Sequence, residues 1–109
     1  KTQQSMFTLD MRIQYLKELR AKDKIEITCQ VLDVDSKRIH YFLKMYNKEN
    51  GFLAANSEQL MIYIDLNSRK SSPFPSLVQQ SLKLLFDKHK KIPIPEEITQ
   101  IIGIRKNKI

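Results

Sequence analysis

The stretch FTLDMRIQY, residues 7–15, alternates apolar and polar side chains without exception. Such alternation places successive side chains on opposite faces of an extended strand, so it predicts a strand that is buried on one face. Comparable runs follow along the chain. Together they predict four strands, at about residues 5–16, 24–34, 38–47 and 52–65.

The last two predicted strands are separated by KENG at residues 48–51, in which Asn-Gly readily adopts the positive φ of a tight turn. This turn predicts that the two strands form an antiparallel pair. Residues 60–64 (LMIYI) are continuously apolar, which indicates burial on both faces and a position in the middle of the sheet.

From about residue 76 the apolar side chains recur every three to four positions, which predicts a helix at about residues 76–89. Its apolar stripe contains Leu77, Val78, Leu82, Leu85 and Phe86. A second, short helix is predicted at residues 96–102. The chain is therefore expected to be one α+β domain over residues 1–109.

Composition narrows the possible functions. The 109 residues are 41% hydrophobic and 28% charged, without an apolar run long enough for a membrane span, and the net charge is +7. An anionic partner is expected from this charge. With Cys29 as its single cysteine, the chain cannot form an intramolecular disulfide, which weakly favours a cytoplasmic location. Cys29 lies in an alternating run and is expected to be buried. Neither histidine has the neighbours that a metal site needs.

Positive charge beside aromatic side chains also permits a different interpretation, a basic β-sheet that binds nucleic acid by base stacking. Two observations argue against it, because the aromatic residues keep core periodicity and no RNP-like Gly-Phe pattern is present. The aromatic residues in question are Tyr15, Tyr41, Phe42, Tyr46 and Tyr63.

Six stretches together resemble one family, the hotdog-fold acyl-CoA thioesterases. They are FTLDMRIQYLKE (7–18), DSKRIH (35–40), ANSEQLM (55–61), YID (63–65), RKSSPFP (69–75) and IGIR (102–105). The resemblance is to the 4-hydroxybenzoyl-CoA thioesterase-like and betainyl-CoA thioesterase-like groups. It implies a curved antiparallel sheet around a helix, hydrolysis of a small or polar acyl-CoA without a cofactor, and a homodimer or tetramer with the site at the subunit interface.

The resemblance also has a gap. Members of the family open with a first strand and an Asp-x-x-Gly-His-x-Asn-like loop that leads into the central helix, and both precede the position of Lys1. The chain is therefore expected to be an N-terminally truncated hotdog domain that is inactive by itself, with the main catalytic acid in the preceding segment. An alternative is a non-catalytic hotdog dimer that acts as a scaffold or acyl binder.

Two carboxylates are weak catalytic candidates, Asp10 and Glu58. The resemblance places Asp10 on a strand that borders the family's site, although an ion pair with Arg12 would also explain it. Glu58 and Gln59 are adjacent in a strand, so they face opposite sides and one of them faces inward. The side chain that faces inward needs hydrogen-bond partners, either in a buried network or in support of the catalytic acid.

The remaining candidates are assigned to binding. Tyr15, Gln59 and His40 are predicted to contact the substrate, although a lone histidine opposite the expected core face is more often a surface or interface residue. Arginine, lysine and serine suit phosphate oxygens. By the resemblance, the phosphates of CoA are therefore assigned to two loop clusters, Lys37-Arg38 and Arg69-Lys70-Ser71-Ser72.

Overall fold

The computed structural model describes residues 3–98 and 102–104. Its elements, in chain order, are β1 (Gln4–Tyr15), β2 (Ile25–Val34), β3 (Arg38–Asn47), β4 (Leu53–Asp65), β5 (Lys70–Ser71) and α1 (Ser76–His89). The four long strands and the helix end within one residue of the ranges predicted from the sequence. The two-residue strand β5 lies in a segment that was expected to be a loop.

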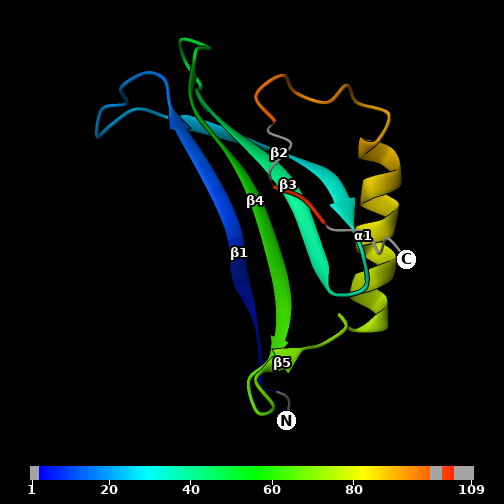
Figure 1. Cartoon of the computed structure of the whole chain (residues 1–109). Helices are drawn as coiled ribbons and strands as arrows, with labels where there is room; N and C mark the ends of the chain where they lie inside the picture. The colour runs from blue at the N-terminus through cyan, green and yellow to red at the C-terminus, as the bar shows by residue number, and fades with distance from the viewer. Residues whose placement is uncertain (1–2, 99–101, 105–109) are drawn as a thin grey trace.

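The strands form one curved antiparallel sheet in the order β1-β4-β3-β2, with β5 paired to the end of β4 (Figure 1). The predicted hairpin between β3 and β4 is present, with Gly51 at φ 77° in its turn. The apolar end of β4 is paired on both sides, as its composition indicates. The α+β hotdog prediction is confirmed for the sheet and its C-terminal helix.

One side of this sheet, the covered face, is buried beneath the C-terminal segment. It carries alternate residues of β4 and β3, and among them Ala54, Glu58, Leu60 and Phe42 are buried. Ile102 and Ile104 pack with Leu60 in one hydrophobic cluster. In Figure 1 the C-terminal segment and α1 lie on the same side of the sheet.

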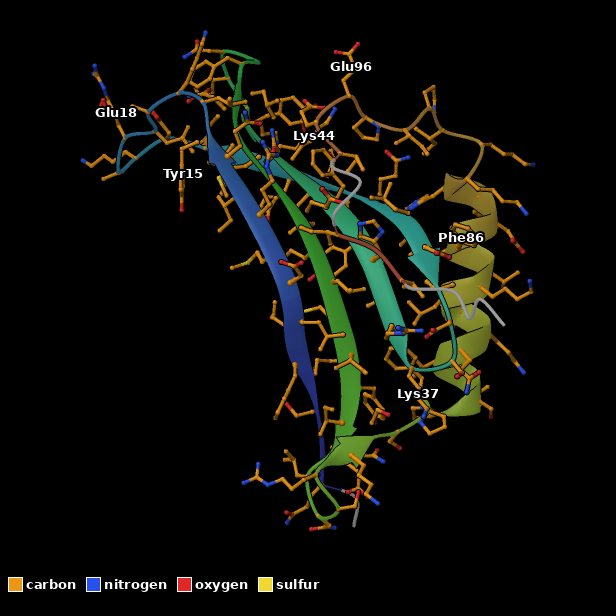
Figure 2. All side chains as sticks on the ribbon, in the orientation of Figure 1. Tyr15, Glu18, Lys37, Lys44, Phe86 and Glu96 are labelled. Carbon is orange, nitrogen blue, oxygen red and sulfur yellow. The ribbon has the colours of Figure 1, made fainter. Side chains whose placement is uncertain are left out.

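The opposite side, the open face, carries the other alternate residues. Met11, Ile13 and Tyr15 of β1 and Ile27 of β2 are all exposed there. Figure 2 shows Tyr15 projecting away from the side that carries α1. A continuous exposed apolar surface of this kind marks a place where a partner or a ligand binds.

Two expectations about burial are wrong. His40 faces the C-terminal segment and is only 7% exposed, because the segment covers its face at Gly103, where an added Cβ would lie 3.9 Å from the imidazole Cε1. Cys29 is exposed, because it lies opposite Leu43 on the open face, which no described residue covers. The sequence indicated that the more apolar face of β3 is the core face, but the structure buries the other face. The environments predicted for His40 and Cys29 are therefore exchanged.

Helix α1 lies beside β2 and has no buried residue, and Leu77 of its predicted apolar stripe is 75% exposed. Its C-terminal end is held to the sheet by His89, whose Nδ1 accepts a hydrogen bond from the Val31 N–H at 2.8 Å. Pro75 is the N-cap residue of α1. Of the predicted helix at 96–102, described residues 96–98 form a turn without helix, and 99–101 lie outside the described residues.

Over residues 3–98 and 102–104, no helix has the length and apolar character required to cross a membrane. In the same part of the chain, no group of three or more His, Cys, Asp or Glu side chains is arranged to hold a metal ion.

Candidate functional site

A cavity of about 260 Å³ lies on the open face, where β1 ends and β4 begins. Its walls come from all four long strands. They are mostly apolar and include Ile13, Tyr15, Ile27, Leu43, Met45 and Ala55. Ser57 and Gln59 contribute polar groups to this wall. An apolar cavity with a few convergent polar groups is the usual form of a small-molecule site.

Gln59 is the centre of a short hydrogen-bonded chain on this face. The Tyr41 hydroxyl donates to Gln59 Oε1 at 2.6 Å, and Gln59 Nε2 donates to Ser57 Oγ at 3.0 Å. Alternation along β4 places Ser57 and Gln59 on the same face, and pairing with β3 places Tyr41 opposite Gln59. Burial, followed by the neighbouring Cys29, raises the pKa of Tyr41, so its hydroxyl stays protonated and donates at neutral pH.

The predicted substrate-binding residues are divided between the two faces. Tyr15 and Gln59 both line the cavity, although Tyr15 is 82% exposed. His40 lies on the covered face, where its Nε2 is 2.8 Å from Glu58 Oε2. The side chains of His40 and Glu58 are 9% and 0% exposed. As adjacent residues of β4, Glu58 and Gln59 face opposite sides, as predicted.

Asp10, the other catalytic candidate, is exposed on β1. It is paired with Leu60, which belongs to the covered face, and its Oδ1 accepts a hydrogen bond from the Met11 N–H at 2.9 Å. The structure therefore brings neither candidate carboxylate to the cavity. Among the described residues that line the cavity, none is an acid.

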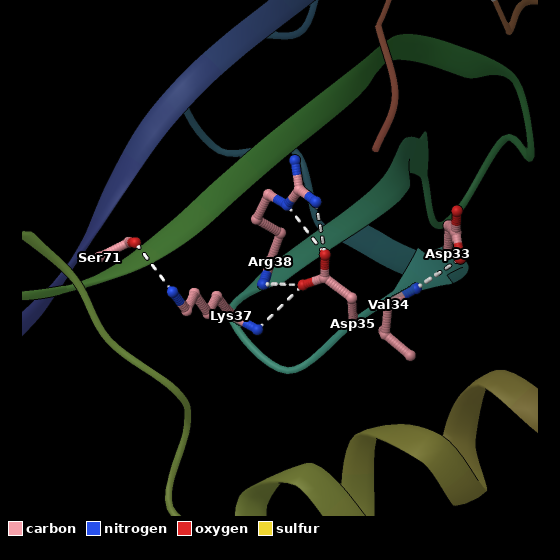
Figure 3. Close-up of polar contacts among 6 residues, drawn as sticks. All are labelled: Asp33, Val34, Asp35, Lys37, Arg38 and Ser71. Carbon is pink, nitrogen blue, oxygen red and sulfur yellow. Dashed lines mark hydrogen bonds and ion pairs between the residues drawn. The ribbon is translucent and has the colours of Figure 1, made fainter. Parts of the chain in front are cut away.

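The two predicted CoA-binding clusters lie together although they are more than thirty residues apart in the sequence. Lys37 Nζ donates to Ser71 Oγ at 3.3 Å, as Figure 3 shows. Backbone hydrogen bonds hold the two loops to β4, because the Tyr63 N–H donates to the Lys37 carbonyl and the Ser72 N–H donates to the Tyr63 carbonyl. We call this region the basic corner; it comprises Lys37, Arg69, Lys70, Ser71 and Ser72.

Arg38 differs from the other basic residues of these loops, because it is engaged within its own turn. Its Nε and Nη2 donate to Asp35 Oδ2 at 2.9 and 2.7 Å (Figure 3). Asp35 Oδ1 also accepts from the backbone N–H groups of Lys37 and Arg38. Burial raises the pKa of Asp35, but these hydrogen bonds and the Arg38 charge outweigh it, so the pKa is lowered overall.

Asp35→Asn should lower the free energy of unfolding at pH 7 by about 1 kcal/mol, the net value of a typical hydrogen bond, with the ion pair adding little at this half-exposed site. Because the folded-state pKa of Asp35 is lowered, its contribution is present above the unfolded-state pKa and is lost as the pH falls through the folded-state value. Urea unfolding at pH 7 and at successively lower pH below the ordinary pKa of 3.8 should show the difference shrinking. Glu49→Gln in the exposed turn is the control, and a difference that does not change with pH would contradict the prediction.

Sequence reasoning missed Tyr41 and Ser57 as site residues. Strand alternation assigns both residues to the open face, and this alternation could have identified them. However, β3 and β4 change register between Met45 and Tyr46, and this one-residue shift decides that Tyr41 lies opposite Gln59. The pattern of apolar residues does not reveal such an irregularity.

The aromatic residues of the nucleic-acid interpretation do not form a stacking platform. Phe42 is buried on the covered face, and the Tyr63 ring packs against Phe74 with centroids 5.1 Å apart. Tyr41 is on the open face and is bonded to Gln59. These rings therefore do not share one exposed surface on which successive bases could stack.

The curved sheet, its strand order and its C-terminal helix are those of a hotdog-fold protein of the thioesterase class. The chain belongs to the thioesterase-like superfamily, whose family model matches residues 1–82.

Individual relatives agree with this assignment. The chain is 31% identical over 100 residues to the betainyl-CoA thioesterase of Pseudomonas aeruginosa, covering 92% of this chain and 63% of that protein. It is also 31% identical over 99 residues to the L-carnitine dehydrogenase/betainyl-CoA thioesterase of Rhizobium meliloti, covering 91% of this chain and 20% of that protein. A Staphylococcus aureus protein solved in complex with CoA superposes with a TM-score of 0.80 and 31% identity, covering 94% of this chain and 64% of that one. The chain thus spans less than two thirds of the length of each of these relatives.

Proposed function

We propose that this chain is part of an acyl-CoA thioesterase that hydrolyses the thioester of a small or polar acyl-CoA. Membership of the thioesterase-like superfamily supports this function, as do the betainyl-CoA thioesterase and the CoA-bound relative. The observation that carries it is that β4 joins an apolar cavity containing Gln59 to a basic corner containing Lys37 and Ser71.

In this proposal the substrate lies along β4. From Gln59 to Asp65 the strand advances six residues, or about 20 Å at roughly 3.3 Å per residue. An extended pantetheine arm would run beside this strand, with the acyl group at the cavity and the phosphates of CoA at the basic corner. Lys37, Arg69 and Lys70 would neutralise those phosphates, and Ser71 and Ser72 would donate hydrogen bonds.

The reaction is attack of water on the thioester carbonyl, with the bond from carbon to sulfur breaking and CoA leaving as the thiol after protonation. A carboxylate has to take the proton from the water or attack the carbonyl itself. Because no described acid lines the cavity, we place the main acid outside these residues, in the segment that precedes Lys1 in the family. Asp10 and Glu58 remain the candidates within this chain.

The exposed apolar side chains of the open face support association of two copies, so we propose a homodimer or a tetramer with the site near the subunit interface. Met11, Ile13 and Ile27 are the side chains that such an interface, or a helix from outside these residues, would cover. We assign the protein to the cytoplasm, where acyl-CoA substrates and a single unpaired cysteine are both expected.

Release of free thiol from a panel of acyl-CoAs, including betainyl-CoA, tests the function. The full-length gene product should hydrolyse at least one small or polar acyl-CoA, and the 109-residue chain should be nearly inactive. Hydrolysis by neither, from folded dimers, would overturn the proposal in favour of a non-catalytic scaffold. Equal rates would place the acid within this chain, and Asp10→Asn and Glu58→Gln would then identify it.

A further inference from the structure

Arg69 has a backbone conformation that its own side chain makes unfavourable. Its φ is 61°, and within the part of the chain that the structure describes it is the one residue other than glycine with a positive φ. In this conformation the Cβ crowds a neighbouring carbonyl oxygen, so residues other than glycine and asparagine adopt it rarely. Arginine at this position therefore lowers the stability of the fold relative to glycine.

The turn between β4 and β5 imposes this conformation. The Asp65 carbonyl accepts a hydrogen bond from the Arg69 N–H at 2.8 Å. The Asp65 carboxylate accepts from the Asn67 N–H at 3.0 Å and from the Ser68 hydroxyl at 3.2 Å. These bonds close the turn and return the chain so that Lys70 pairs with Asp65. The fold thus needs a left-handed residue at this point, but it does not need an arginine.

The Arg69 side chain makes no contact within the fold that would offset this cost. Arg69 is exposed, and its guanidinium forms no hydrogen bond or ion pair with residues 3–98 or 102–104. Arg38 and Lys37 differ from it, because they bond to Asp35 and Ser71. A group that binds from outside the fold is therefore the reason for an arginine at this point.

The register of β5 against β4 determines the order in which a CoA thioester would meet the basic corner. Ser71 is paired with Ile64 and Lys70 with Asp65, so Arg69 lies in the turn beyond the last residue of β4. In CoA the diphosphate follows the pantetheine arm, and the ribose with its 3′-phosphate lies beyond the diphosphate. A substrate that runs from the cavity along β4 therefore brings its diphosphate to Ser71 and its 3′-phosphate to Arg69.

We propose that Arg69, together with Lys70, binds the 3′-phosphate of CoA and selects CoA thioesters over thioesters that lack this phosphate. A guanidinium can donate two parallel hydrogen bonds to one phosphate, and an ammonium group cannot. The inference rests on the proposed function and narrows its substrates, because acyl-dephospho-CoA and acyl groups on a protein-bound phosphopantetheine both lack the 3′-phosphate. The unfavourable backbone of Arg69 is the stability lost in placing a guanidinium at this point.

A matched pair of substrates tests the binding role. For the best acyl group of the panel, the full-length product should hydrolyse the acyl-CoA with a kcat/KM at least about tenfold above that for the acyl-dephospho-CoA, the factor expected of a hydrogen bond to a charged group. Arg69→Gly and Arg69→Ala should each lower this ratio about tenfold. Lys37→Ala should lower kcat/KM for both substrates and leave most of the ratio, because Lys37 lies beside Ser71 at the diphosphate.

Stability provides a second readout, which a purely binding role would not move. Without ligand, Arg69→Gly should raise the Tm of the full-length product by about 2–4 °C. Arg69→Ala should not raise it, because alanine has the same unfavourable backbone conformation and lacks only the charge. Arg20→Gly is the control, since Arg20 is an exposed arginine between β1 and β2 without a positive φ. It should neither raise the Tm nor change the substrate ratio.

Two results on these variants would overturn the inference. One is an unchanged substrate ratio in Arg69→Gly and Arg69→Ala, which would show that the guanidinium does not bind the 3′-phosphate. The other is an equal Tm of Arg69→Gly and Arg69→Ala, which would contradict the backbone cost on which the inference is based.

Binding keeps this test separate from the test of hydrolysis. If the full-length product hydrolyses no acyl-CoA, the proposed function fails, and calorimetry with CoA and dephospho-CoA decides the inference alone. Tighter binding of CoA, lost in Arg69→Ala, would support the inference. Equal affinities for CoA and dephospho-CoA would overturn it.

Discussion

Replacing Glu58 with alanine should lower the free energy of unfolding by about 1–3 kcal/mol, because His40 is then left as a buried polar group without its hydrogen-bond partner. Glu58 Oε2 lies 2.8 Å from His40 Nε2, and the Glu58 side chain is fully buried on the covered face. Urea unfolding at neutral pH and one protein concentration measures the effect.

The double substitution His40→Leu with Glu58→Leu distinguishes the stability that the pair contributes from the cost of leaving one member without its partner. It should be more stable than either single leucine variant, because neither member of the pair is then left buried without the other. Glu26→Ala, at an exposed carboxylate of β2, should change stability by less than about 0.5 kcal/mol. Unchanged stability of Glu58→Ala together with loss of thiol release would contradict this prediction and favour Glu58 as a catalytic group.

Removing the lysines of the basic corner should weaken the binding of substrate without slowing the chemical step. Lys37→Ala combined with Lys70→Ala should raise KM for an acyl-CoA roughly 10- to 100-fold, since a hydrogen bond to a charged group contributes about 1.5–3 kcal/mol. The kcat should stay nearly constant, because contacts with the phosphates are the same in the bound substrate and in the transition state. Steady-state kinetics on the full-length product at two salt concentrations measures both constants.

Lys83→Ala on α1 is the matched control, since it removes the same charge from a residue that is not part of the basic corner. A dephospho-CoA thioester provides a second check, because loss of the 3′-phosphate should reduce the effect of the lysine substitutions. A fall in kcat at constant KM, or an equal effect of Lys83→Ala, would show that the basic corner does not bind the phosphates.

Much of the fold was accessible from local patterns. The alternation in residues 7–15, the turn at 48–51 and the helical spacing after residue 76 predict elements that the structure contains. The resemblance in six stretches added the hotdog class, which composition and periodicity do not provide. Helix α1 marks the limit of this reasoning, because its apolar stripe predicts a buried side while the structure places it beside β2 with no buried residue.

The candidate site was predictable only in part. Adjacent residues of a strand face opposite sides, so the separation of Glu58 from Gln59 followed directly from their positions. The convergence of Lys37 and Ser71 depended on both loops meeting at the end of β4, which the resemblance suggested and local pattern does not. Tyr41 and Ser57 were missed because their importance comes from what lies opposite or beside them.

By itself, the sequence determined the extended and helical segments, the antiparallel hairpin and the pairs of residues that cannot share a face. These properties depend on the spacing of neighbouring side chains, which each segment carries locally. Only the tertiary structure decided which face is covered, because the C-terminal residues that bury His40 are some sixty positions further along the chain. It also decided which residues meet in the cavity, because the register shift between Met45 and Tyr46 places Tyr41 opposite Gln59.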